Sequence, residues 1–145
     1  MDKYEYKLRA EEIKNLISKK QYADAAQVAD SIDWSRVKSV RMLCTVSDVY
    51  KANRRFEDAK EMLLLANDRN PGGRSILYGL CDLAIRMGDV VSAVKYYGQY
   101  EKVAATDSKK YILKYRLYQA QDVSLEERIE VLSEQEEGLF GKMGL

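Results

Sequence analysis

The sequence contains no histidine and only two cysteines among its 145 residues. Without histidine, the chain lacks the commonest metal ligand and the usual general base near neutral pH. Cys44 and Cys81 lack the Cys-x-x-Cys spacing of a zinc or redox site, so we expect structural thiols. Residues 71–74 (Pro-Gly-Gly-Arg) lack the lysine and the spacing of a phosphate-binding loop. These absences predict a protein that is not an enzyme and needs no cofactor.

Long apolar runs are missing as well. No stretch approaches the roughly 18 to 20 apolar residues that cross a bilayer, and the charged segment Met1–Glu12 has no signal-peptide core. The net charge of +1, from 24 basic and 23 acidic residues, gives no general attraction to nucleic acid. Scattered basic residues, such as the pair Arg54–Arg55, are expected to be solvated. The sequence thus predicts a cytoplasmic protein with neither a membrane nor a nucleic acid as partner.

Residues that break helices are few, and the most abundant residues favour helix. One Pro and eight Gly interrupt a chain rich in Ala, Leu, Lys, Glu and Arg. The periodicity of apolar residues predicts about seven to eight helices. They lie near Tyr4–Lys19, Tyr22–Ile32, Ser35–Ala52, Phe56–Asp68, Arg74–Met87, Val90–Ala104 and Ser108–Gln121, with a last one from about Ser124.

A repeat of 34 residues organises these helices. An apolar position and a small position recur at this spacing, at Tyr22, Phe56 and Val90 and at Ala25, Ala59 and Ala93. Each pair of positions follows one helical stretch and a short polar turn, and begins another helical stretch. The repeated structure is therefore helix, turn, helix, and neighbouring repeats must stack to bury their apolar faces.

The second repeat carries a further pattern at Leu43, Val46, Ser47, Tyr50, Ala59, Leu63 and Pro71. This pattern resembles that of a tetratricopeptide repeat (TPR), whose signature is W-x2-L-G-x2-Y, then A-x3-F, then P. The third repeat matches at Leu77, Leu80, Cys81, Ala93 and Tyr97. The resemblance covers residues 6–107 well and 108–137 poorly. It implies an all-α fold, a right-handed α-solenoid of helix-turn-helix repeats, with one domain over 1–137 and repeats near 6–39, 40–73, 74–107 and, in degenerate form, 108–137.

The resemblance also implies a function, because TPR proteins bind protein segments in a concave groove lined by the first helix of each repeat. Carrying the groove positions over gives a mixed surface with more positive than negative charge, suited to a peptide of acidic and apolar character. The candidate residues are Lys7, Lys14, Arg41, Asp48, Lys51, Tyr78, Asp82, Arg86, Lys109 and Arg116. We expect a scaffold or adaptor whose partner is a protein or peptide.

Tyrosines are concentrated in the second half of the chain, where seven of the eleven lie between Tyr78 and Tyr118. Their helical spacing is compatible with packing between helices. It is also compatible with an aromatic binding surface, since tyrosine is enriched at interface hot spots. Both interpretations remain open at this stage.

The glycine-rich end, residues 138–145, is expected to be an irregular tail that cannot cap a solenoid. Three explanations are open: the chain is a piece of a longer repeat array, its end self-associates into a homo-oligomer, or the tail folds back. The alternative function is accordingly structural, with the groove or the open end filled by the chain itself or by a second copy.

Overall fold

The structure, a computed structural model, describes residues 1–104, 106–122 and 124–142, and the side chains of all of these except 125 and 135–142. Within these residues the regular structure is entirely helical, so the predicted all-α class is confirmed. The chain divides into two compact units, the first ending at Pro71 and the second beginning at Gly72. The single domain over 1–137 and its repeat limits stay predictions.

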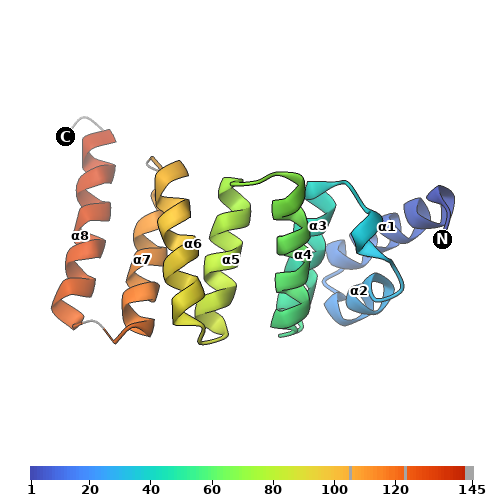
Figure 1. The fold of residues 1–145 in the computed structure, drawn as a ribbon, viewed down its shortest axis with the longest axis horizontal. Coiled ribbons are helices and arrows are strands. Elements are labelled where there is room, and N and C mark those ends of the chain that lie inside the picture. Colours follow the sequence, from blue (N-terminus) through green and yellow to red (C-terminus); the bar gives the residue numbers. More distant parts are fainter. Residues whose placement is uncertain (105, 123, 143–145) are drawn as a thin grey trace. The chain divides into compact units, whose positions relative to one another are not determined.

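The first unit consists of two helical hairpins (Figure 1), and α2 of the first packs on α3 of the second. A short 3-10 helix, η1, connects the hairpins and contacts α4. The helices of this unit are α1 (Lys3–Ser18), α2 (Tyr22–Ala29), η1 (Trp34–Arg36), α3 (Val40–Ala52) and α4 (Phe56–Arg69).

The second unit also consists of two hairpins, whose helices run alternately up and down in Figure 1. Here α7 contacts both α5 and α6, so the first helices of these two repeats are neighbours. The helices are α5 (Arg74–Arg86), α6 (Val90–Val103), α7 (Lys109–Ala120) and α8 (Leu125–Lys142).

The 34-residue period is visible in the backbone of the turns inside each hairpin. One residue in each turn adopts the left-handed conformation, with φ of 59°, 59°, 74° and 59° at Lys20, Arg54, Gly88 and Asp122 respectively. In the third repeat the amide of Asp89 donates to the carbonyl of Ala84 at 2.9 Å, which closes the end of α5. The sequence has the favoured glycine at only one of these four positions.

The small residues at the repeat spacing mark where the two helices of a hairpin touch. Ala25, Ala59 and Ala93 are completely buried, and their small size lets the helix axes come close. In the second repeat the Ser47 hydroxyl donates to the carbonyl of Ala59 at 2.9 Å. In the third, the Cys81 thiol donates to the carbonyl of Ala93 at 3.4 Å. The small residue of the first helix therefore also satisfies a backbone carbonyl of the second.

The start of the third helix differs from the sequence prediction. A helix from Ser35 is wrong, because α3 begins at Val40 and Ser39 is its cap, with its hydroxyl accepting from the amide of Met42 at 3.2 Å. The residues before it form η1, where the Trp34 indole donates to the carbonyl of Ala29 at 2.9 Å. This contact, and the packing of Trp34 in the core, override the local helix signal.

The irregular tail predicted from residue 138 is wrong for residues 138–142, because α8 continues to Lys142. Each glycine in a helix costs about 1 kcal/mol relative to alanine, but extending an existing helix adds a hydrogen bond for each residue fixed. Two separated glycines do not outweigh that gain. Residues 143–145 lie outside the described residues.

Two glycine-to-alanine substitutions should have opposite effects. Gly88→Ala is expected to lower the free energy of unfolding by about 1 to 2 kcal/mol, because φ there is +74°. Gly98→Ala, in the middle of α6, should raise it by about 0.5 to 1 kcal/mol. An added Cβ meets nothing within 4 Å at either position, so neither effect involves a clash. Urea denaturation followed by circular dichroism measures both, and equal effects would contradict the assigned turn.

Candidate functional site

Three of the sequence-predicted groove residues meet on neighbouring first helices of the second unit. Asp82 of α5 is buried, and its carboxylate accepts from Nε of Arg86 at 3.1 Å and from Nη1 of Arg116, on α7, at 2.5 Å. The Asp82 side chain is 4% exposed, whereas those of Arg116 and Arg86 are 28% and 45% exposed. We call this group the Asp82 cluster. In it, one buried carboxylate holds two guanidinium groups that are partly exposed to solvent.

Tyr78 lies one helical turn before Asp82 and belongs to the same surface. Its ring packs edge-on against Tyr100, with 5.5 Å between ring centroids. Burial, and then the nearby Asp82 carboxylate, raise the pKa of the Tyr78 phenol above its usual value. The phenol is therefore neutral at physiological pH and can donate a hydrogen bond or receive one. Lys109, also predicted, is exposed near the start of α7.

The predicted residues of the first unit are mostly solvated. Lys7 and Lys14 are exposed on α1, and Arg41 and Asp48 are exposed on α3. Lys14 pairs with Glu11 at 3.5 Å, and Lys51 pairs with Asp48 at 3.9 Å. Exposed pairs of this kind contribute little to stability. These residues leave a charged surface with no organised cluster comparable to that around Asp82.

The same repeat position has very different surroundings in different repeats. Lys14, Asp48, Asp82 and Arg116 are spaced by 34 residues. Asp48 is 77% exposed, whereas Asp82 is buried and bound by two arginines. The sequence placed Asp82 and Arg116 at groove positions but gave no sign that one would bind the other, because that contact depends on the packing of α5 on α7.

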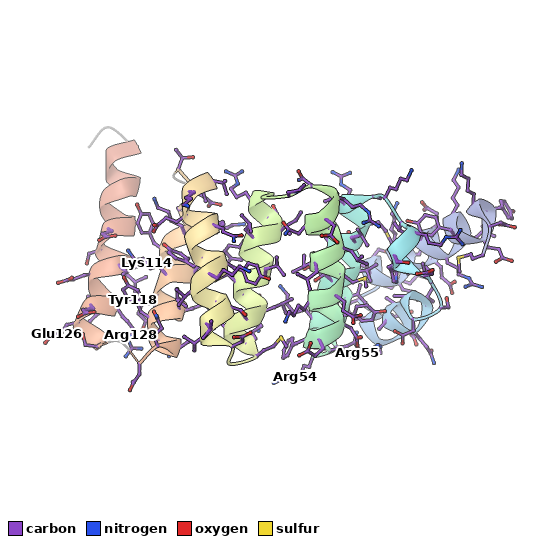
Figure 2. The ribbon with its side chains drawn as sticks, viewed as in Figure 1. Arg54, Arg55, Lys114, Tyr118, Glu126 and Arg128 are labelled. Carbon is purple, nitrogen blue, oxygen red and sulfur yellow. The ribbon has the colours of Figure 1, made fainter. Side chains whose placement is uncertain are left out.

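Some of the clustered tyrosines serve packing between helices, and others are accessible enough to form part of an aromatic surface. Tyr97 and Tyr100 are buried, and their hydroxyls donate to Glu101 and Asp107 at 3.0 and 3.1 Å, as packing requires. Tyr115 and Tyr118 of α7 are only half-buried. Cations lie over both rings. Arg128 is 5.6 Å from the Tyr115 centroid, and Lys114 is 5.6 Å from the Tyr118 centroid (Figure 2).

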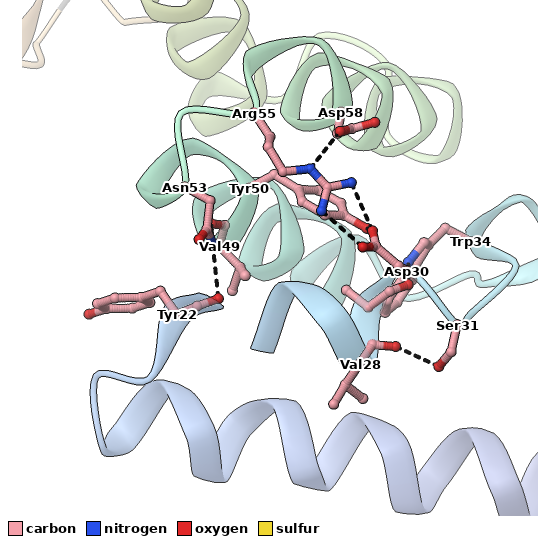
Figure 3. A network of polar contacts seen from close by, with 11 residues as sticks. Tyr22, Val28, Asp30, Ser31, Trp34, Val49, Tyr50, Asn53, Arg55 and Asp58 are labelled. Carbon is pink, nitrogen blue, oxygen red and sulfur yellow. Dashed lines mark hydrogen bonds and ion pairs between the residues drawn. The ribbon is translucent and has the colours of Figure 1, made fainter. Parts of the chain in front are cut away.

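A further polar network in the first unit was missed by the sequence analysis. Arg55 donates to both carboxylate oxygens of Asp30 at 2.9 Å and to Asp58 at 2.8 Å (Figure 3). Its guanidinium also lies 4.6 Å from the centre of the Tyr50 ring, and the Tyr50 hydroxyl donates to Asp30. Arg55, expected to be a solvated base, instead links the end of α2 to the start of α4. Asp30 and Arg55 are 25 residues apart, and no sequence rule pairs residues at that separation.

Neither cysteine has the surroundings of a nucleophile. Burial raises the pKa of the Cys81 thiol to about 12, and Cys81 is completely buried. Burial, and then the charge of Asp48, also raise the pKa of Cys44. Reactive cysteines need a lowered pKa and access to solvent. Both thiols therefore stay protonated near neutral pH.

Comparison with known proteins supports the repeat fold. The crystal structure of a Podosopora anserina protein, assigned as a kinesin light chain with nearly identical TPR-like repeats, superposes on this chain with a TM-score of 0.72. The match covers 94% of this chain and 76% of the other, at 16% sequence identity. The chain has a TPR-like repeat fold. The predicted TPR resemblance is thereby confirmed at the level of the fold.

The other comparisons add no relative to this TPR-like chain. No family profile matches it, and no curated protein matches it significantly. Among the described residues, no helix of the TPR-like fold has both the length and the apolar character that crossing a bilayer demands. The same described part of the chain holds no group of three or more acidic or cysteine side chains placed to bind a metal ion.

Proposed function

We propose that this TPR-like chain is a non-catalytic protein-interaction module that binds an acidic and apolar peptide segment along α5 and α7, the first helices of its third and fourth repeats. The Asp82 cluster is the observation that carries the proposal. A single buried carboxylate fixes two guanidinium groups on adjacent first helices. A preorganised donor pair of this kind loses less conformational entropy on binding than free arginines do.

The cluster has capacity left for a guest carboxylate. Each guanidinium carries five N–H donors, and Asp82 engages Nε of Arg86 and Nη1 of Arg116. Two positive charges against one negative leave the group cationic. Arginine is well suited to carboxylates because its planar fork can donate two parallel hydrogen bonds. The neighbouring Tyr78 ring supplies an apolar and hydrogen-bonding surface for the same segment.

A titration with a synthetic peptide tests this function. The probe is a short peptide in which Glu and Leu are interspersed with Ser. The control peptide is the same except that Lys replaces every Glu. Arg116 is left unchanged, so that the buried Asp82 keeps one ion-pair partner. The double variant is Arg86→Gln with Lys109→Gln, and both of these side chains are exposed. Two exposed charges removed should weaken binding of the acidic peptide by about two- to thirtyfold. Isothermal titration calorimetry measures the change.

The matched control is Lys95→Gln with Lys102→Gln, which removes two exposed positive charges from α6 and leaves the first helices intact. The control should bind the acidic peptide like the parent chain. An equal loss in both variants would mean that net charge, and not this surface, attracts the peptide. Absence of binding by the parent chain would also defeat the proposal.

A further inference from the structure

The first unit contains a pocket that none of the predicted groove residues lines. It has a volume of about 450 Å³ and lies among α2, η1, α3 and α4. We call it the acidic pocket. Its lining consists of Ala29, Asp30, Ile32, Asp33, Trp34, Ser35, Tyr50, Asp58, Glu61, Met62, Leu64, Leu65 and Asp68. We propose that the acidic pocket binds a segment of a partner protein that carries lysine or arginine next to an apolar side chain.

The floor of the pocket is apolar and held in place. Ile32, Trp34 and Met62 are buried. The Trp34 indole donates to the carbonyl of Ala29 at 2.9 Å, and its ring packs edge-on against Tyr6, with 6.3 Å between centroids. A fixed aromatic floor favours binding because little ordering is needed when a side chain enters.

The wall formed by η1 is also fixed. Arg69 of α4 donates through Nη2 to the carbonyl of Ser35 at 2.7 Å and through Nε to the carbonyl of Val37 at 3.3 Å. These bonds tie the segment that carries Trp34 to α4, which forms another wall. The pocket is therefore built by long-range contacts and does not depend on a guest for its shape.

The rim is acidic. Five of the lining residues carry carboxylates, and the only cation bonded to any of them in the described structure is Arg55, which engages Asp30 and Asp58. The hydrogen bond from Arg55 lowers the pKa of Asp30, and hydrogen bonds from Ser35 lower that of Asp33. Both are ionised at neutral pH. Negative charge thus exceeds positive charge around the pocket.

Two rim carboxylates are available to a guest. Glu61 and Asp68 lie on one face of α4, seven residues apart, and are exposed. In the part of the chain that the structure describes, no side chain or backbone group pairs with either of them. The exposed Leu64 lies between them in sequence and lines the same pocket.

Charge and shape together select the occupant. A lysine or arginine can lay its aliphatic stem along Trp34 and Leu64 while its charged end reaches Glu61 or Asp68. An adjacent apolar side chain fits the buried floor. An acidic peptide or a nucleic acid would be repelled by the same carboxylates.

Trp34 makes the site directly testable, because it is the only tryptophan of the chain and lies in the pocket. An unlabelled short peptide, with Lys and Leu interspersed with Ser, is titrated into the full chain while tryptophan emission is recorded. We expect a saturable change in Trp34 emission with the Lys peptide. The matched peptide with Glu at every Lys should give none.

The variant Glu61→Gln with Asp68→Asn should weaken binding of the Lys peptide by about two- to thirtyfold. The control, Glu12→Gln with Glu57→Gln, also removes two exposed carboxylates from the first unit but none from the pocket. It should bind like the parent chain. Replacing Leu by Gln in the Lys peptide should reduce affinity as well, because the apolar floor then gains no partner.

Three outcomes would overturn the inference. These are an equal loss of affinity in variant and control, a calorimetric signal for the Lys peptide without a change in Trp34 emission, or no binding at all. A concentration-dependent change in emission without peptide, together with dimers in light scattering, would assign the pocket to a second copy of this chain. The Arg86 and Lys109 variant should leave Lys-peptide binding unchanged, so failure of one site does not imply failure of the other.

Discussion

Asp82→Ala is expected to lower the free energy of unfolding by about 2 to 4 kcal/mol. Removing one partner of a fully buried ion pair typically costs about 3 to 5 kcal/mol, because the other charge is left without compensation. The cost here should be somewhat smaller, since the side chains of Arg116 and Arg86 are 28% and 45% exposed and can be partly hydrated. Urea denaturation of the parent chain and the variant measures the difference.

Asp48→Ala is a matched control for this prediction. Asp48 occupies the same repeat position as Asp82, but its side chain is 77% exposed. The substitution should change stability by no more than about 0.5 kcal/mol. If both aspartates had the same effect, the cost would come from the helix position rather than from the Asp82 cluster. A small effect of Asp82→Ala alone would show that the two arginines do not depend on the carboxylate.

Tyr100→Ala should be similarly damaging, with a loss of about 3 to 5 kcal/mol, as for other large aromatic side chains removed from a core. Tyr100 is completely buried in the core of the second unit, and its ring contacts those of Tyr78 and Tyr97. Tyr100→Phe should cost only about 1 kcal/mol, because it keeps the ring and loses the hydrogen bond to Asp107. Chemical denaturation of both variants separates ring packing from the hydroxyl.

The hydroxyl of Tyr100 should also leave a signature in alkaline solution. Burial, and then the hydrogen bond to Asp107, raise its pKa above the usual value. The folded state therefore holds a proton that the unfolded chain releases near pH 10. Stability contributed by this group is complete below about pH 10 and falls as the pH rises further. In Tyr100→Phe that part of the decline should be absent, and an unchanged decline would contradict the assignment.

The repeat fold was predictable because its signals are local or periodic. The buried alanines at Ala25, Ala59 and Ala93, and the starts of α2, α4 and α6, follow directly from the 34-residue spacing. A helix was instead predicted too early at Ser35, because tertiary contacts override the local signal: Trp34 packs in the core, and Arg69 bonds the residues on either side of Arg36. The bonds of Arg69 to the carbonyls of Ser35 and Val37 come from more than thirty residues away.

The candidate site was predictable only in part, for a related reason. The repeat alignment placed Asp82, Arg86 and Arg116 at groove positions, but it could not distinguish the buried Asp82 from the exposed Asp48. Asp82 differs because the next repeat supplies Arg116 as its partner. The acidic pocket was not predicted at all, because its residues come from four elements and their sequence pattern has no shared period.

The bond between Asp82 and Arg116 makes the third and fourth repeats unequal partners. These residues occupy the same position in successive repeats. If residues 74–107 were copied once in tandem, Asp82 would face the aspartate of its own copy, and two carboxylates would share one buried site. One of them would have to take up a proton or the junction would open. Lengthening the array by simple duplication would therefore destabilise this junction, because Asp82 would lose Arg116 as its partner.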